Sequence, residues 1–268
     1  MTNATQTYTE DELDIASGKL RVLSGGDPKN EPVVVLHHST GSPGWLPFHE
    51  ALSEKFRVYA PDIPGYGQSD RPQWARDPRD LAILLNQANE HAHWGGPIHL
   101  VGLGFGGFVA AEMATMNQSG LKSLTLIGSA GTQPRDGEIL DQMMVDYPEY
   151  VQAGFKDEDA YNVVFGEEGA KEMKDLWDFS REMTARVTWK PYMFNRRLVP
   201  LMAGVKTKTL LIWGENDAII PLDCAKQFQE SMPNAELKVI PGAGHLVELE
   251  DPNGIADLIA AHISVAAN

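Results

Sequence analysis

The chain is poor in cysteine. Its 268 residues contain one, Cys224, so no internal disulfide can form and no cysteine cluster can hold a metal. Cys224 lies in the run Pro221-Leu222-Asp223-Cys224-Ala225, which is typical of the first turn of a helix and lacks the tight turn that exposes a reactive thiol. We expect Cys224 to be buried and structural, and a single thiol fits a reducing, cytoplasmic location.

Long apolar runs and positive charge are also scarce. No window approaches the roughly 18 apolar residues of a membrane span, and residues 1–10 lack the apolar core of a secretory signal. The 22 Lys and Arg face 37 Asp and Glu, which gives a net charge of −15. Phosphate backbones and anionic lipids attract clustered basic residues, so we expect neither nucleic acid nor membrane as a partner. The oligomeric state stays open.

Alternating strand and helix patterns fill most of the chain. A continuous β-branched run at 32–36 is typical of the middle of a parallel sheet, and further strands are expected at 56–60, 124–127, 209–213 and 236–240. Between them the pattern predicts helices at 45–55, 77–93, 225–231 and 252–265, after a hairpin over 6–24 that turns at Ser17-Gly18. This alternation predicts an α/β fold with a mostly parallel sheet.

The alternation stops between residues 131 and 203. This segment is rich in Met and aromatic residues with helical spacing, which indicates a helical cap inserted into an α/β core of residues 1–130 and 204–268. We expect Trp177 and Met143 of the cap to line an apolar pocket for a small-molecule substrate.

A strand, a sharp turn and a helix meet at Gly102-Leu103-Gly104-Phe105-Gly106. This pattern is typical of a nucleophile elbow, G-x-S-x-G, but here the tip is Gly104 and carries no side chain. The glycines up to Gly107 also fit the dinucleotide fingerprint G-x-G-x-x-G, which needs a carboxylate about 20 residues later at the end of the next strand. That strand ends in Gly128-Ser129-Ala130, so the nucleotide-binding interpretation is disfavoured.

Five motifs in the same order and spacing make the chain resemble the α/β-hydrolase superfamily over nearly its full length. They are the elbow, His37-His38-Ser39, the loop 61–69, Trp213-Gly214-Glu215-Asn216-Asp217, and Gly242-Ala243-Gly244-His245. The resemblance implies eight mostly parallel strands flanked by helices, with the site beneath the cap and no cofactor. Two departures stand out: Gly104 replaces the nucleophile, and His38 stands where the superfamily usually has glycine, so we expect the His38 side chain to contact substrate.

The remaining catalytic parts are predicted from the ends of the strands. Asp217 and His245 follow consecutive strands, which brings a carboxylate to an imidazole that then acts as a base. The N–H group of Phe105 at a helix N-terminus, together with that of Ser39, forms an expected oxyanion hole. His37 and His38 lack a third ligand and, being adjacent in an extended segment, point to opposite faces, so we predict no metal site.

The missing nucleophile leaves several hypotheses. A glycine at 104 frees a volume comparable to one water, roughly 30 Å³, and a water held there could attack an ester or carbonyl compound directly. Alternatively, His245 takes a proton from the substrate in a lyase, isomerase or oxygenase reaction. A third hypothesis is that the protein only binds a ligand, and a fourth is that Gly104 is an engineered replacement of serine. Ser39, Ser42, Ser129 and Asp62 are better explained as turn, capping and backbone-bonding residues than as displaced nucleophiles.

Overall fold

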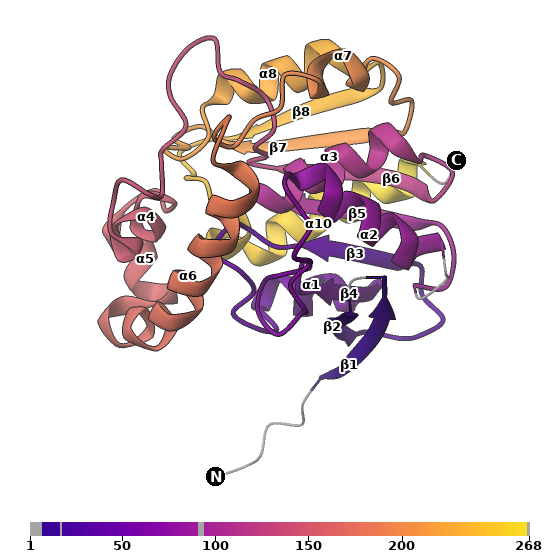
Figure 1. The fold of residues 1–268 in the computed structure, drawn as a ribbon, viewed down its shortest axis with the longest axis horizontal. Helices are drawn as coiled ribbons and strands as arrows, with labels where there is room; N and C mark the ends of the chain where they lie inside the picture. Colours follow the sequence, from indigo (N-terminus) through magenta and orange to yellow (C-terminus); the bar gives the residue numbers. More distant parts are fainter. Residues whose placement is uncertain (1–6, 17, 91–93, 267–268) are drawn as a thin grey trace.

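The computed structural model describes residues 7–16, 18–90 and 94–266, and the fold is an eight-stranded sheet with helices on both faces (Figure 1). Along the sheet the strands lie in the order β1-β2-β4-β3-β5-β6-β7-β8. Strand β2 runs antiparallel to β1 and β4, and the remaining pairs are parallel. The strands are β1 (Tyr8–Ile15), β2 (Gly18–Gly25), β3 (Pro32–Leu36), β4 (Arg57–Pro61), β5 (Ile98–Leu103), β6 (Leu121–Ile127), β7 (Thr209–Gly214) and β8 (Ala235–Ile240).

The central strands are buried on both faces because apolar side chains alternate across the sheet. In β3, Val33 and Val35 belong to one hydrophobic core, whereas Val34 and Leu36 belong to the other. Every residue of β5 and of β7 is buried. This two-sided burial is the reason why the sequence of these strands reads as continuous apolar runs.

Two layers of helices pack on the two faces of the sheet. Helices α2 (Pro78–Glu90), α3 (Phe105–Met116) and α8 (Leu222–Ser231) cover one face, and α7 (Leu198–Met202) contacts both α3 and α8. Helices α1 (Pro47–Ser53), α9 (Val247–Glu250) and α10 (Pro252–Ala266) contact one another over the opposite face. The carboxyl ends of β3 and β7 point toward the side of the molecule where the inserted helices lie (Figure 1).

Three helices of the inserted segment stand beside that edge of the sheet: α4 (Tyr147–Ala153), α5 (Glu158–Val164) and α6 (Gly166–Thr188). The sequence begins the first two with local signals, because Pro148 lies in the first turn of α4 and the side chain of Asp157 caps α5 by accepting the N–H of Ala160. Helix α7, also within 131–203, packs on the α/β core instead.

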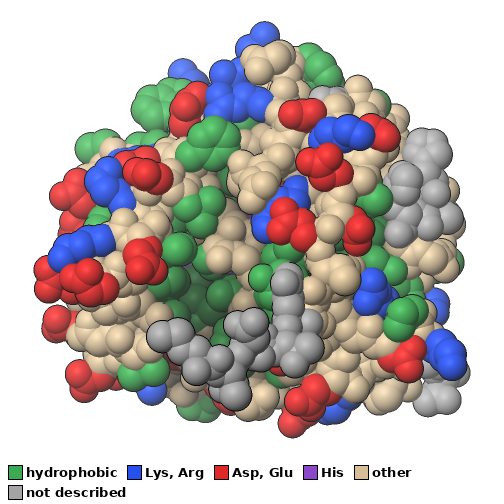
Figure 2. Space-filling model, turned by 90° about the horizontal axis from the view of Figure 1, so that it is seen from below, with side chains coloured by type: hydrophobic (Ala, Val, Ile, Leu, Met, Phe, Trp, Pro, Cys, Tyr) green, Lys and Arg blue, Asp and Glu red, His purple; other side chains and the backbone are tan. Residues whose placement is uncertain are grey.

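A groove of about 450 Å³ separates residues 163–165 and Met173 from the loop 43–47 and from Leu249. Its lining is largely apolar, and Val163 is 87% exposed. Figure 2 shows a face of the molecule that is hollowed in this way, with hydrophobic side chains in the hollow. No described helix is both long and apolar enough to cross a bilayer.

The expected elements are present with shifts of a few residues at their ends. The predicted strand at 32–36 coincides with β3, and the predicted helix at 225–231 begins earlier, at Leu222. The predicted hairpin is confirmed as β1 and β2, although Ser17 of its turn lies outside the described residues, as do residues 91–93 of the helix predicted over 77–93. Cys224 is buried, and burial raises the pKa of its thiol to about 11, as a structural cysteine requires.

A buried carboxylate ties two helices on one face of the sheet together. Glu112 of α3 is fully buried and accepts hydrogen bonds from Arg79 of α2 at 2.6 Å and from Asn195 at 2.7 Å. A charge without water needs such partners, because desolvation otherwise outweighs any gain.

We predict that Arg79→Met lowers the free energy of unfolding by about 2 kcal/mol, since Glu112 then stays buried without its cation, and the 28% exposure of the Arg79 side chain moderates the loss. Urea denaturation measures the change. The matched control is Arg196→Met, which removes an exposed arginine and should leave stability within about 0.5 kcal/mol of the original. Equal stability of all three proteins would contradict a role for the buried ion pair.

Candidate active site

The turn between β5 and α3 has the form of a nucleophile elbow. Gly104 has φ +51° and ψ −109°, a backbone conformation that is strained for every residue except glycine. The neighbouring glycines let strand and helix touch: a Cβ atom on Gly102 would lie 2.6 Å from the carbonyl oxygen of Gly106, and one on Gly106 would lie 2.3 Å from that of Leu36. Close packing therefore accounts for the glycines that also match the dinucleotide fingerprint.

Asp217 and His245 meet at the ends of two paired parallel strands, β7 and β8. The Nδ1 atom of His245 lies 2.8 Å from Oδ2 of Asp217, and both side chains are buried. The other oxygen of Asp217 accepts the N–H groups of Ile219 at 2.9 Å and Ile220 at 2.8 Å, which fixes the carboxylate. An ionised Asp217 thus selects the tautomer of His245 with Nδ1–H, leaving Nε2 as the basic atom.

The pKa of His245 reflects two opposed effects. Burial alone lowers it, but the charge of Asp217 and the hydrogen bond to Asp217 outweigh burial, with a smaller contribution from Glu248. The result is a pKa above the ordinary histidine value. His245 is therefore a stronger base than an unpaired buried imidazole.

A second imidazole–carboxylate pair lies beside the first. Nε2 of His38 is 3.0 Å from Oε1 of Glu248 on α9, and Glu248 is 1% exposed. The rings of His38 and His245 are 5.1 Å apart between centroids, at 61° to one another. Glu248 was not predicted from the sequence, where its position three residues after the predicted base His245 is the one available signal.

We call the point where the Cβ atom of a side chain at residue 104 would lie the nucleophile position. Nδ1 of His38 is 2.5 Å from this point and Nε2 of His245 is 3.2 Å from it. The expectation that Gly104 leaves a water-sized space here is thus corrected, because Nδ1 of His38 approaches this point too closely. A serine at 104 requires His38 to move first, so Gly104 is not a simple replacement of serine in an unchanged site.

The expected oxyanion donors come from the elbow and from the loop after β3. Phe105 is the first residue of α3, and the N–H group of the next residue, Gly106, already donates to the carbonyl of His37 at 3.0 Å. The N–H groups of Ser39 and Phe105 have no acceptor among the described residues. Two free amides, one at the positive end of a helix, are suited to bind a developing negative charge.

The alternative nucleophiles have other partners. The hydroxyl of Ser129 donates to the carbonyl of Ala130, and that of Ser42 donates weakly to Gly44. Asp62 accepts the N–H of Gln68 and a side-chain N–H of Arg21, which agrees with its predicted backbone-bonding role. These contacts leave Ser39, whose hydroxyl lies 3.5 Å from that of Tyr150 and which lines the same small cavity as His245.

A small cavity of about 10 Å³ adjoins the two imidazoles, enough for one water. Core residues His38 to Thr40, Ile219, His245 and Leu246 form its floor, and Tyr150, Val151 and Gly154 form its roof. Tyr150 and Val151 belong to α4. Of the predicted substrate-binding residues, only His38 lines this cavity.

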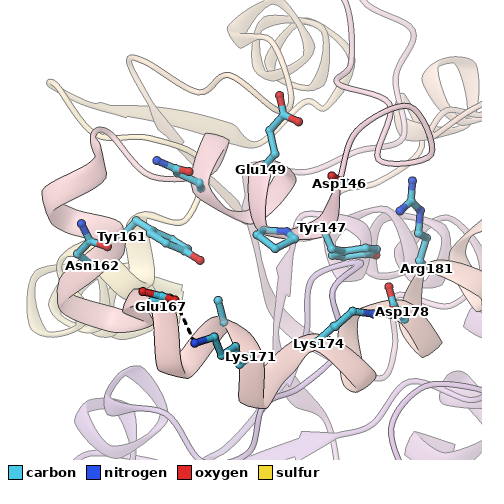
Figure 3. Close-up of a pocket in the computed structure, with 13 residues that line it drawn as sticks. Asp146, Tyr147, Glu149, Tyr161, Asn162, Glu167, Lys171, Lys174, Asp178 and Arg181 are labelled. Atoms are coloured by element: carbon cyan, nitrogen blue, oxygen red, sulfur yellow. Dashed lines mark hydrogen bonds and ion pairs between the residues drawn. The ribbon is translucent and has the colours of Figure 1, made fainter.

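A larger cavity of about 730 Å³ lies on the other side of α4, between α4, α5 and α6 (Figure 3). Several of its charges pair with each other, including Lys171 with Glu167 and Lys174 with Asp178. It contains no base comparable to His245, so we place the chemistry in the smaller cavity. Helix α4 separates the two cavities.

The other two predicted substrate-binding residues lie away from the dyad. Trp177 of α6 is buried and stacks on Tyr147 of α4 at 6.2 Å between ring centroids, so it supports the roof from behind. Met143 is half-buried in the loop before α4, where its N–H donates to Asp141. Neither side chain lines the cavity at His245.

We predict that Gly104→Ala lowers the free energy of unfolding by about 2 kcal/mol, because the new methyl group meets Nδ1 of His38 in a strained backbone conformation. In a His38→Ala background the same substitution should cost clearly less, since the contact with His38 is gone and only the backbone strain and the 3.2 Å approach to Nε2 of His245 remain. A double-mutant cycle in urea measures this coupling. An identical penalty in both backgrounds would show that the two residues do not compete for space.

Comparison with known proteins agrees with this architecture. The model of the alpha/beta hydrolase family matches residues 33–258. The 2-hydroxymuconate semialdehyde hydrolase of Pseudomonas sp. strain CF600 is 25% identical, and the alignment covers 98% of each chain. The 2-hydroxy-6-oxononadienedioate/2-hydroxy-6-oxononatrienedioate hydrolase of Burkholderia vietnamiensis is 26% identical over 82% of this chain and 83% of its own.

Solved structures show the same fold at lower identity. A bacterial membrane phospholipase A superposes with a TM-score of 0.82 at 22% identity, covering 98% of this chain and 87% of its own. The 2-hydroxy-6-oxo-6-phenylhexa-2,4-dienoate hydrolase of Rhodococcus sp. strain RHA1 gives 0.75 at 22% identity, covering 96% and 100%. Since the family model spans most of the sequence and the relatives include hydrolases, the chain belongs to the alpha/beta hydrolase family of enzymes.

Proposed function

We propose that the protein hydrolyses a small, largely apolar ester or carbonyl compound with a water molecule that His245 activates, without a serine nucleophile. One observation carries the proposal: Nε2 of His245, backed by Asp217 at 2.8 Å, lies 3.2 Å from the nucleophile position, where Gly104 offers no attacking atom. A base so oriented serves proton transfer, and a protein that only binds a ligand has no need of one.

The proposed reaction proceeds in two proton transfers. Nε2 of His245 takes a proton from water as the water oxygen bonds to the carbonyl carbon, and the N–H groups of Ser39 and Phe105 hold the resulting oxyanion. The imidazolium, stabilised by Asp217, then gives the proton to the leaving group as its bond to carbon breaks. The free base is restored without a covalent intermediate.

The substrate class is inferred from the cavity and the relatives. Val151, Ile219 and Leu246 make the wall beside His245 apolar. The names of the relatives describe hydrolases of small carbonyl compounds, which supports the same class here. The cavity has space for a water only, so a substrate enters when α4 moves and joins it to the larger cavity on the other side. In this proposal residues 131–203 act as the cap that sets specificity.

A panel of esters, lactones and vinylogous diketones should reveal turnover, and His245→Ala should reduce kcat/KM on the best substrate by about 10²- to 10⁴-fold, the usual contribution of a general base. Release of acid and alcohol, followed by chromatography, checks hydrolysis. Isomerised or cleaved product without incorporation of labelled water oxygen would indicate proton abstraction from the substrate instead. Equal rates for the wild type and His245→Ala would contradict the proposal.

We predict that the pH dependence of kcat/KM reflects the pairing of His245 with Asp217. Because His245 must be neutral to accept a proton, kcat/KM should rise with pH through a pKa above the ordinary value of about 6.5. Asp217→Asn removes the charge that raises this pKa, so the acid limb of the profile should move to lower pH while the maximal rate falls. Glu230→Gln, which alters an exposed carboxylate on α8, should leave the limb in place.

A further inference from the structure

We propose that His38 is a second catalytic residue: its Nδ1 atom accepts the other hydrogen of the attacking water, so that the water is held between two imidazoles. This inference rests on the proposed hydrolytic function and names how the same site orients its nucleophile. It assigns to His38 a direct contact with a reacting atom, beyond contact with substrate.

The positions of the two rings carry the inference. Nδ1 of His38 and Nε2 of His245 lie 2.5 Å and 3.2 Å from the one nucleophile position, although the residues come from opposite ends of the chain. The rings face each other edge to face, with 5.1 Å between centroids. The cavity that both rings line has a volume of about 10 Å³, which admits a single water.

A buried acid determines which nitrogen of each neutral ring carries the proton. Glu248 is held 3.0 Å from Nε2 of His38, so a neutral His38 carries its proton there and presents a bare lone pair at Nδ1. Asp217 does the same for His245 from the Nδ1 side, leaving the lone pair at Nε2. Two acceptors therefore lie beside the same small cavity, which is the arrangement that a molecule with two O–H donors satisfies.

A water in the cavity that both rings line has its remaining electron pairs free for a carbonyl carbon. As the oxygen–carbon bond forms, one proton passes to His245, while the second O–H stays bonded to oxygen and donates to His38. The imidazolium of His245 later protonates the leaving group as the carbon–oxygen bond of an ester breaks, giving acid and alcohol. His38 ends the cycle in its starting form, so the balance of atoms and charge needs no further reactant.

Burying the Glu248 carboxylate costs free energy, and the site accepts this cost to hold the His38 ring in its orientation. The side chain of Glu248 is 1% exposed, and its Oε2 atom has no hydrogen-bond partner among the described residues. A residue that only filled the space beside Gly104 would not need a buried carboxylate behind it. The pair is thus the counterpart of Asp217 and His245, built from the loop after β3 and from α9.

The test compares His38→Asn with His38→Leu. Asparagine places its side-chain oxygen near the position of Nδ1 and keeps an acceptor there, whereas leucine has a similar reach and no acceptor. On the best ester of the panel, His38→Leu should lower kcat about tenfold or more with little change in KM, as loss of one hydrogen bond to a reacting atom predicts. His38→Asn should retain most of kcat.

Two controls keep the result specific. His262→Leu removes another buried histidine, on α10 and away from the site, and should leave kcat unchanged. Thermal unfolding of each variant verifies that the protein is folded. His245→Ala is measured alongside, because its loss of activity establishes the proposed function independently of His38.

The outcomes separate the two proposals. If His245→Ala is inactive while His38→Leu keeps wild-type kcat, the role of His38 is overturned and the proposed function stands. Equal losses in His38→Asn and His38→Leu would also overturn it, because the acceptor would then be irrelevant. An acyl group on His38, found by mass spectrometry after rapid quenching, would make His38 the nucleophile and refute the water-binding role. If His245→Ala retains full activity, both proposals fall together.

Discussion

The geometry of the site depends on a competition for space between the His38 ring and any side chain at residue 104. His38 and any Cβ atom at residue 104 cannot occupy the same space, because Nδ1 of His38 lies 2.5 Å from where that atom would be. Glycine at 104 therefore permits His38, and His38 in turn takes the space that an attacking side chain requires. The elbow keeps its strained backbone, and in the proposed reaction the N–H groups of Ser39 and Phe105 bind the oxyanion while a water molecule supplies the attacking atom.

Two buried acids stabilise this arrangement. Asp217 and Glu248 each bind one imidazole, and both carboxylates are 1% exposed. Ionised groups without water are costly unless each has a charged or hydrogen-bonded partner, and here each acid also fixes which nitrogen of its histidine is basic. Electrostatics and protonation are thus coupled: changing either carboxylate alters both the stability of the site and its proton affinity.

The architecture explains where specificity can arise. The parallel strands deliver the loops of His38, Gly104, Asp217 and His245 to one edge of the sheet, as expected of an α/β sheet. The roof over that edge comes from α4, which also bounds the larger cavity of about 730 Å³ on its far side. Aromatic packing of Trp177 against Tyr147 supports α4 from behind, and in the proposed function residues 131–203 act on the site through the position of this helix.

Sequence alone determined the sheet, the elbow and the Asp217–His245 pair, because these follow from local periodicity, turn chemistry and strand order, which are properties of short segments. It predicted that His38 departs from the superfamily pattern, but not that the ring fills the place beside Gly104, nor that Glu248 binds it. Those facts belong to tertiary structure: residues 210 positions apart meet at 3.0 Å only after the sheet and α9 have packed. Which side chains converge on one point is decided by packing in three dimensions, and no pattern along the chain encodes that distance.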